Sequence, residues 1–341
     1  MNVLLSAVGR RDYLVRWFKG ALGDTGKVVA TNSDPSTSGM EAADFARVLP
    51  KSTDPGYVDA LLSVCQQFEV GLLCSLHDWD APVIAASADR FEQIGVRLAV
   101  SSLEVLKICL DKFRFQDYLH TIGVRSPETF ASLSDVERAL EGSSLRFPLV
   151  VKPRFGQGST GTFIISSIEE LYAAHLLSSK VAVLPPFQGG STKGELVVIQ
   201  QFVSGVEYGM DVINDLNGNY RTTLARRKIQ MRLGETESAE TVIESFAEKI
   251  GSQIGSNLGH IGVLDLDLVI DSQGTPWVID ANPRFGGGYP FSHLAGADVP
   301  SALISWAKGR TAPSGCLAIQ AGVRARKHLV PEIILSSINN R

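Results

Sequence analysis

The first hundred residues alternate short apolar runs with segments whose apolar residues recur at helical spacing. The runs typical of strands cover residues 2–8, 27–32, 70–76 and 96–100. The helical segments between them cover residues 11–22, 57–68 and 82–94. Parallel neighbouring strands need a crossover connection, which a helix normally supplies. The alternation therefore predicts a parallel sheet with helices on its faces, an α/β domain over residues 1–105.

Ligands of such sheets bind at the carboxyl ends of the strands, where this sequence places two polar clusters. They follow the first and third strands and comprise Gly9, Arg10 and Arg11, and His77, Asp78 and Asp80. A dinucleotide site is rejected, because one glycine stands where the phosphate-binding fingerprint needs three. The two arginines at the start of a helix indicate an acidic small-molecule ligand, with solvated helix-start charges as the alternative.

From Ser101 on, the pattern changes to helices mixed with antiparallel strands. A helical pattern covers residues 101–123, and a strand pair around a glycine-rich turn covers residues 147–166. A run of strands follows at residues 195–231, and an amphipathic helical pattern at residues 239–258. The run of strands contains the hairpin signal Asn-Gly at residues 217–218. We expect an α+β unit made of two subdomains, residues 106–198 and 199–341.

The composition excludes several classes of protein. Acidic and basic residues are interleaved, the formal net charge is −4, and no basic patch typical of a nucleic-acid binder is present. No apolar run is long enough to span a bilayer, and the apolar start is too short for a signal peptide. The cysteines lie far apart in apolar or helical settings, at Cys65, Cys74, Cys109 and Cys316. They are typical of core thiols in a reducing compartment, so we expect a cytoplasmic protein that binds neither nucleic acid nor membrane.

The strongest site signal is a pair of strands within residues 262–288. Asp265 and Asp267 share one face of the first strand, and Asp280 and Asn282 share one face of the second. If the connecting loop is residues 272–275, the faces coincide and Asp267 lies opposite Asp280. Two close carboxylates repel each other unless a cation bridges them, and oxygen ligands suit Mg²⁺ or Mn²⁺. The alternative, ordinary solvated acids, is less consistent with the apolar residues around them.

Groups suited to anions lie close to this pair. Arg284 is expected to continue the face of Asn282, and the glycines at 286–288 let backbone N–H groups approach an anion. Lys152 ends a buried strand, where a lysine needs an anionic partner. The loop Gly156–Gly161 follows it and is suited to covering phosphates, although it is not a Walker loop because the lysine precedes the glycines.

With these motifs in order, the chain resembles the ATP-grasp superfamily, and in particular a single synthetase unit of the carbamoyl phosphate synthase large chain. The matching stretches are LLSAVGRRDYLV, CLDKFRFQDYL, LVVKPRFGQGSTG, VIQQFVSGVEYGMDV and DANPRFGGGYPFSHLAG. The resemblance implies a Rossmann-like, parallel-sheet pre-ATP-grasp domain followed by a two-subdomain ATP-grasp fold that grips ATP. This chain departs from the common pattern by carrying aspartate at both acidic metal positions, where glutamate or glutamine is more usual.

The resemblance also implies roles for individual residues. The residues implied to contact the ATP phosphates or to lie in the loop that closes over them are Lys112, Lys152, Gly156, Gly158 and Ser159. Those implied to read adenine through the backbone, or to hold the ribose, are Gln200, Gln201, Val203 and Glu207. Lys228 would lie near the γ-phosphate, with Arg226 or Arg227 as alternatives. The implied metal ligands are Asp267, Asp280 and Asn282, and Arg284 would act with Lys152 and Lys228 in catalysis by neutralising the transferred phosphoryl group.

The implied reaction is attack of a substrate carboxylate on the γ-phosphate, giving ADP and an acyl phosphate that an amine converts to an amide. We therefore expect an ATP-dependent carboxylate–amine ligase for a small carboxylic or amino acid. Carbamoyl phosphate synthesis itself would need two such units. The alternatives are a nucleotide-binding regulatory protein without ligation and a kinase-like enzyme that stops at the acyl phosphate. Residues expected near the substrates are Arg10, Arg11, Asp78, Gly287, Tyr289 and His293. Whether the chain forms a homodimer, and whether the tail from Thr311 adds a strand or a partner contact, stays open.

Overall fold

The fold is described from a computed structural model for residues 1–156, 158–183, 196–232 and 234–331. Its first part is a five-stranded parallel sheet in the order β3-β2-β1-β4-β5. The strands are β1 (Asn2–Ser6), β2 (Val28–Asn32), β3 (Phe45–Val48), β4 (Val70–Ser75) and β5 (Arg97–Ala99). The helical elements are α1 (Asp12–Leu22), η1 (Gly23–Thr25), α2 (Ser38–Ala42), α3 (Tyr57–Gln67), α4 (Ala81–Ala85) and α5 (Ala88–Gln93).

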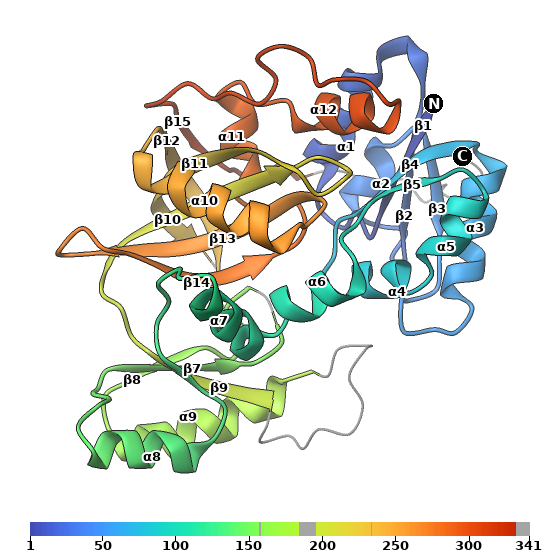
Figure 1. The fold of residues 1–341 in the computed structure, drawn as a ribbon. Coiled ribbons are helices and arrows are strands. Elements are labelled where there is room, and N and C mark those ends of the chain that lie inside the picture. Colours follow the sequence, from blue (N-terminus) through green and yellow to red (C-terminus); the bar gives the residue numbers. More distant parts are fainter. Residues whose placement is uncertain (157, 184–195, 233, 332–341) are drawn as a thin grey trace.

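The parallel α/β architecture predicted for this part is confirmed (Figure 1). Two details differ from the prediction. The helix expected at residues 82–94 is two short helices, α4 and α5, and the sequence pattern did not reveal α2 or β3. Both missed elements are very short, so they carry too few apolar residues to show a period.

The second part is a four-stranded antiparallel sheet, in the order β6-β9-β7-β8, with α8 and α9 beneath it in Figure 1. Its strands are β6 (Thr129–Phe130), β7 (Leu149–Pro153), β8 (Phe163–Ile165) and β9 (Val197–Gln201). The helices of this stretch are α6 (Leu103–Cys109), α7 (Lys112–Thr121), α8 (Leu133–Glu141) and α9 (Ile168–Val181), of which α6 and α7 contribute to the core of the third part. Asp111 interrupts the helical pattern of residues 101–123, because its carboxylate caps α7 by accepting the N–H groups of Phe113 and Arg114.

The third part is a six-stranded sheet in the order β14-β13-β10-β11-β12-β15, with every pair antiparallel. Its strands are β10 (Gly205–Asn214), β11 (Tyr220–Arg232), β12 (Glu235–Val242), β13 (Gly262–Asp271), β14 (Pro276–Asn282) and β15 (Arg324–Arg326). Its helices are α10 (Ser245–Leu258), α11 (Tyr289–Leu294) and α12 (Val299–Ala307).

The predicted hairpin at residues 217–218 is confirmed as the turn between β10 and β11. The helix predicted for residues 239–258 is wrong at its start, because residues 239–242 pair with β11 as the end of β12. Tertiary pairing overrides local helical periodicity there. The tail contributes the strand β15, and its last ten residues, 332–341, lie outside the described part.

One hydrophobic core holds the first sheet against the third part. Side chains from α1 and from the β14–α11 region share it, and the rings of Phe18 and Phe285 pack edge to face with centroids 6.1 Å apart. The expected domain boundaries after residues 105 and 198 stay predictions, and β9 runs across the second of them. All four cysteines are buried free thiols.

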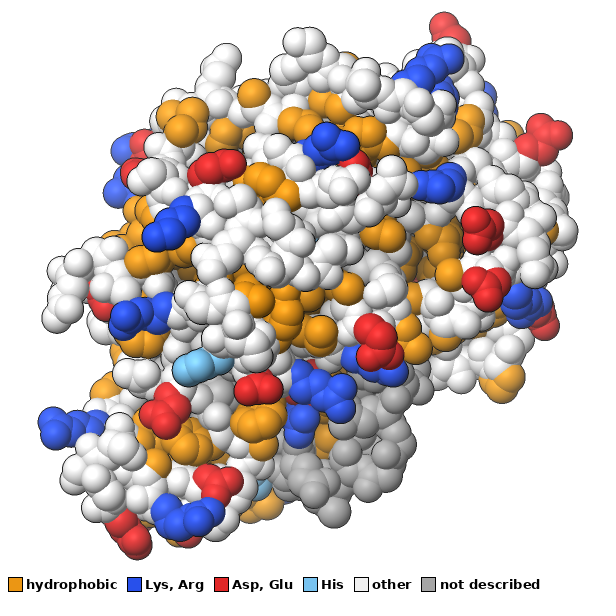
Figure 2. Space-filling view, in the orientation of Figure 1, with side chains coloured by type: hydrophobic (Ala, Val, Ile, Leu, Met, Phe, Trp, Pro, Cys, Tyr) orange, Lys and Arg blue, Asp and Glu red, His pale blue; other side chains and the backbone are white. Residues whose placement is uncertain are grey.

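The surface agrees with the mixed charge pattern of the sequence, since acidic and basic side chains are interspersed on the face shown in Figure 2. Among the helices of the described ranges, none combines the length and apolar character needed to cross a membrane.

Candidate functional site

Two aspartates face each other on β13 and β14. The connecting loop is residues 272–275, as expected, and the register pairs Asp267 with Asp280 and Asp265 with Asn282. The side chain of Asp267 is 38% exposed and that of Asp280 is 22% exposed. The predicted juxtaposition is therefore confirmed, and both carboxylates can be reached from solvent.

Lysines lie beside both carboxylates. The Nζ atom of Lys228, on β11, is 2.6 Å from Asp267 Oδ1 and 3.6 Å from Glu207 Oε2. Burial disfavours its ammonium, but the carboxylates together outweigh that effect and raise the pKa of Lys228. Lys112, at the start of α7, places Nζ 3.7 Å from Asp280 Oδ2. Within the described ranges no group of three or more His, Cys, Asp or Glu side chains is placed to hold a metal ion, and the residue that pairs with Asp265 beside the two carboxylates is the amide Asn282.

Lys152 lies on β7 at the back of the same region. Its side chain is buried and Nζ donates to Gln200 Oε1 at 3.0 Å, while Gln200 Nε2 donates to Thr129 Oγ1. Burial lowers the pKa of Lys152 to about 8, partly offset by the negative charge of Asp280. The ammonium of Lys152 is buried and donates a hydrogen bond to the neutral amide of Gln200, so it is well suited to receive an anion.

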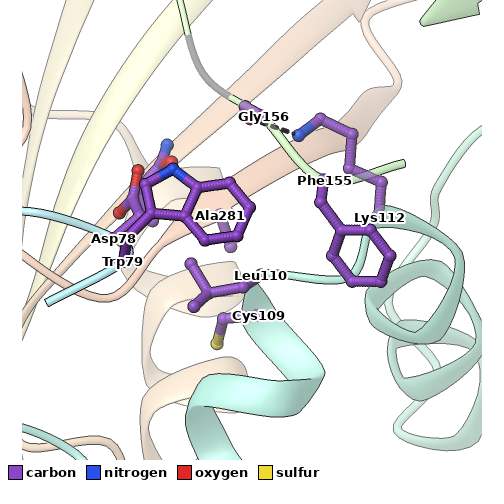
Figure 3. Close-up of a pocket in the computed structure, with 9 residues that line it drawn as sticks. Asp78, Trp79, Cys109, Leu110, Lys112, Phe155, Gly156 and Ala281 are labelled. Carbon is purple, nitrogen blue, oxygen red and sulfur yellow. Dashed lines mark hydrogen bonds between the residues drawn. The ribbon is translucent and has the colours of Figure 1, made fainter. Parts of the chain in front are cut away.

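The glycine-rich loop reaches from the four-stranded sheet to the six-stranded one. Gly156 O accepts a hydrogen bond of 2.8 Å from Lys112 Nζ, as Figure 3 shows. Gly158 and Ser159 have φ values of +66° and +55°. A Cβ on Gly234 would lie 2.4 Å from Gly158 O, so the loop touches the turn between β11 and β12. The loop therefore contacts Lys112 at one end and the turn after the strand of Lys228 at the other, while Gln157 lies outside the described residues.

The residues expected at adenine and ribose lie where the two sheets join. Gln200 and Gln201 end β9, and the N–H of Gln201 is already bonded to Glu128 O at 2.9 Å. Val203 follows in the connection to β10, and Glu207 lies on β10 with an exposed side chain beside Lys228. The structure brings Gln200 and Glu207 to Lys152 and Lys228 respectively, and their nucleotide roles stay predictions.

Arg284 is held by the first domain. Its Nε atom lies 2.8 Å from Asp78 Oδ1, and Nη2 donates to Asp78 Oδ2 at 2.9 Å and to Asn282 Oδ1 at 3.4 Å. Both charged partners are buried. Burial alone would raise the pKa of Asp78, but the guanidinium and its hydrogen bond lower it overall. The expectation that Arg284 continues the strand is wrong, because β14 ends at Asn282. Its side chain nevertheless reaches Asn282.

The two neighbouring arginines of the first domain behave differently. Arg11 donates from Nη1 to Leu76 O, and burial together with the charge of Arg284 lowers its pKa. Arg10 has a side chain that is 85% exposed, 4.0 Å from Glu235 Oε1. Of the pair, Arg11 is therefore the one whose charge acts on Arg284 and Asp78.

Other residues expected near the substrates have packing contacts. Tyr289 is fully buried, and its hydroxyl accepts the N–H of Val299 and donates to Ala297 O. His293 stacks on Trp17 of α1 with ring centroids 3.9 Å apart. A Cβ on Gly287 would lie 3.5 Å from Lys327 Nζ. These residues join α11 to α1 and to the tail, and their assignment to substrates stays a prediction.

Sequence reasoning missed a buried charge cluster under the site. Arg226, weighed only as a substitute for Lys228, is 1% exposed and binds Asp211 at 2.6 Å and Asp265 at 2.9 Å. Burial and the charge of Asp267 raise the pKa of Asp265. A Cβ on Gly286 would meet the Asp265 carboxylate at 2.0 Å, and one on Gly288 would meet the Arg226 guanidinium at 2.1 Å. Glycine is therefore required by this cluster at positions 286 and 288. The alternation Gly-x-Asp at 209–211, opposite Arg226, was the available signal.

A cavity connects these parts (Figure 3). Its walls come from the β4–α4 loop, the α6–α7 junction, the glycine-rich loop and β14, and they comprise Asp78, Trp79, Cys109, Leu110, Lys112, Phe155, Gly156, Ala281 and Asn282. Figure 3 shows the Trp79 indole across the cavity from Phe155 and Lys112. Trp79 had not been singled out, although it follows Asp78 directly. The β4–α4 loop is anchored by Asp80, a buried carboxylate that accepts hydrogen bonds from Ser6, Tyr57 and Ser75.

Two known protein families match consecutive parts of the chain. Residues 109–288 match the ATP-grasp domain family, and residues 3–99 match the PylC-like, N-terminal domain family. Because the first match covers more than half of the chain, the chain belongs to the ATP-grasp family.

Individual relatives are more distant. The chain is 22% identical to the carbamoyl phosphate synthase arginine-specific large chain of Bacillus subtilis (strain 168) over 268 residues, which are 76% of this chain and 24% of that protein. The chain thus spans about a quarter of the length of that relative.

Two solved structures share the fold. The biotin carboxylase domain dimer of 2-oxoglutarate carboxylase from Hydrogenobacter thermophilus, in complex with MgADP, ADP and bicarbonate, has a TM-score of 0.70 at 18% identity, covering 91% of this chain and 70% of that chain. The L-amino acid ligase from Bacillus licheniformis has a TM-score of 0.65 at 19% identity, covering 89% and 73%. These named relatives are enzymes.

Proposed function

We propose that the chain is an ATP-dependent ligase that joins a small carboxylic or amino acid to an amine through an acyl phosphate. The observation that carries the proposal is the opposed pair Asp267 and Asp280, with Lys112, Lys152 and Lys228 around it. Phosphoryl transfer needs positioning and charge neutralisation more than covalent chemistry from the protein. In the proposal the lysines neutralise the phosphate charge and the two aspartates position the phosphates through a bound cation.

The donor set fits a hard divalent cation. Asp267 and Asp280 are side by side and partly exposed, and Asn282 adds a neutral oxygen on the same face. In the proposal these three residues hold Mg²⁺, which when bound would draw charge from the ATP phosphates and fix their orientation. Both carboxylates now have lysine partners, whose ammonium groups are free to turn to the phosphates once the cation is bound.

The basic side chains and the glycine-rich loop would then have separate roles. Lys112 and Lys152 would bind phosphate oxygens, and Lys228 would lie next to the transferred group. The glycine-rich loop, which touches the turn at Gly234, would exclude water from the acyl phosphate. Arg284, fixed by Asp78, would orient the substrate carboxylate at the phosphoryl group.

The test of the reaction uses pools of amino and carboxylic acids with Mg-ATP. We expect substrate-dependent ADP release and a new amide by mass spectrometry, and hydroxylamine should trap the acyl phosphate as a hydroxamate. Lys152→Ala should lose the ADP release. ADP release with a hydroxamate but without any amide would indicate a kinase-like enzyme. Saturable ATP binding without turnover across broad pools would favour a regulatory protein and contradict the proposal.

We further propose that Arg11 binds a second anionic group of the substrate. Partial burial and the charge of Arg284 lower the pKa of Arg11, and its guanidinium donates to the neutral carbonyl of Leu76, so it can receive a further anion. Arg11→Ala should raise the substrate KM by about tenfold or more, with ATP affinity unchanged. Arg10→Ala is the matched control, because that side chain is exposed. Equal effects of the two variants would contradict this assignment.

A further inference from the structure

A second cavity lies away from the candidate site and shares no residue with the first one. It is a groove of about 690 Å³, within the range of small-molecule pockets. Three segments far apart in the sequence form it: the start of β5, the turn between β10 and β11, and the chain from Trp306 to Ala318. A ligand here would touch both the first domain and the sheet that carries Asp267.

The groove has an excess of positive charge. Arg97 donates from Nη2 to Asn217 Oδ1 at 3.2 Å, and Arg221 donates from Nε to Asp215 Oδ2 at 3.1 Å. Burial raises the pKa of Asp215, but hydrogen bonds from the turn and from Arg221 lower it overall, so this carboxylate is ionised at neutral pH. Arg310 makes no side-chain hydrogen bond or ion pair within the described part of the chain. Three arginines and one aspartate thus line the groove, and two of the three guanidinium groups already have hydrogen-bond partners.

The floor of the groove is apolar and packed against the core. Leu216 belongs to the core shared by the first domain and the third sheet, and Trp306 and Leu317 pack against that core. On the face shown in Figure 2, hydrophobic side chains are exposed around α12, with basic side chains close by. A fixed aromatic surface next to cations recognises a flat ring that carries an anion.

We propose that this groove binds a ligand in which a flat apolar ring is joined to a phosphate group. The excess of two positive charges matches a phosphate monoester, which carries about −1.5 to −2 charge at pH 7. The ring would lie on Trp306 and Leu317, and the phosphate would bind the guanidinium groups, Arg310 above all.

The experiment is isothermal titration calorimetry on the full chain, with Mg-ATP at saturation so that the nucleotide site is filled. We expect phenyl phosphate to bind at one site per chain. Inorganic phosphate and phenol, which each carry one half of the ligand, should each bind at least about tenfold more weakly. Arg310→Ala should weaken phenyl phosphate by about tenfold or more, because it removes a charge-assisted contact. Arg146 is an exposed arginine outside the groove, so Arg146→Ala should leave the affinity for phenyl phosphate unchanged.

Three results would overturn the proposal. They are the absence of saturable binding up to about 10 mM phenyl phosphate, equal affinity in Arg310→Ala and the parent chain, and binding that is seen in a parallel titration without Mg-ATP but is lost with it. The last would place the probe in the nucleotide site. Circular dichroism of Arg310→Ala checks that the variant is folded. The readout is binding and does not require turnover, so its failure is separate from failure of the proposed ligase reaction.

Discussion

The acidic side chains of the site fall into two groups, distinguished by the cation that partners them. Asp267 and Asp280 are partnered by lysines and have side chains that are 38% and 22% exposed. The other three are partnered by arginines: Asp211, Asp265 and Asp78, with exposures of 0%, 12% and 9%. The two groups lie side by side, since Asp265 and Asp267 are on one face of β13.

The difference in partner explains a difference in role. A guanidinium is a planar fork that binds carboxylates in fixed geometry, whereas an ammonium is a point charge on a flexible chain. The arginine-paired acids are buried, so separating them would leave an uncompensated charge in the core. The lysine-paired acids can exchange partners in contact with water. We infer that the first group holds the framework and the second receives the ligands.

The largest expected effect is on the framework. Arg226→Ala leaves Asp211 and Asp265 buried without their cation, so we expect the free energy of unfolding to fall by about 3–5 kcal/mol. Urea unfolding followed by circular dichroism measures it. If the alanine variant does not fold, Arg226→Lys, which keeps the charge but loses the fork, should show a smaller loss. A lysine variant as stable as the parent would remove the distinction between the two groups.

The next effect is on turnover. Asp280→Asn removes one proposed metal ligand from a partly exposed position, so ADP release should fall at least about 100-fold. The free energy of unfolding should change little, because the side chain reaches solvent. Parallel urea unfolding and ADP assays on the same preparation separate the two quantities. A loss of stability as large as that of Arg226→Ala would place Asp280 in the framework.

These two groups also show what the sequence alone could predict. The register of β13 and β14 follows from alternation and an even loop, so the facing of Asp267 and Asp280 was predictable. The parallel sheet was predictable from the order of apolar and helical segments. The ion pairs of Arg226 were not predicted. The alternation at 209–211 is a weak signal, and Asp211 and Asp265 lie on two other strands whose register with β11 no local pattern specifies.

The same limit applies to Asp78 and Arg284, which are 206 residues apart in the chain. Each was singled out by its place at the end of a strand, but the packing of the first domain against α11 is what makes them partners. The glycines at 286 and 288 were read as anion receptors, whereas the structure shows them making room for Asp265 and Arg226. Close approach of side chains from other strands leaves no trace in local sequence.

A smaller effect tests the lysine group by pH. The pKa of Lys152 is lowered to about 8 by burial, against about 10.4 for an unfolded lysine. Between these values the unfolded chain binds more protons, so the stability of the nucleotide-free protein should rise with pH. Mg-ATP affinity should instead fall about tenfold from pH 7 to pH 9, because the neutral amine no longer attracts phosphate. Thermal unfolding and ATP titration should move in opposite directions, and Lys152→Arg should abolish the fall in affinity. Parallel pH profiles in parent and variant would contradict the assignment.

The smallest expected effect separates burial from the identity of the cation. Arg10 and Glu235 form an arginine pair like those of the framework, but the side chains are 85% and 55% exposed and 4.0 Å apart. Exposed pairs gain little because water screens them and two long side chains must be ordered. If burial gives the framework pairs their strength, Arg10→Ala should leave the unfolding midpoint and ADP release within error of the parent, at low and at high salt. If the guanidinium fork alone were sufficient, Arg10→Ala would lower the unfolding midpoint measurably at low salt, and burial would not be needed to explain the strength of the framework pairs.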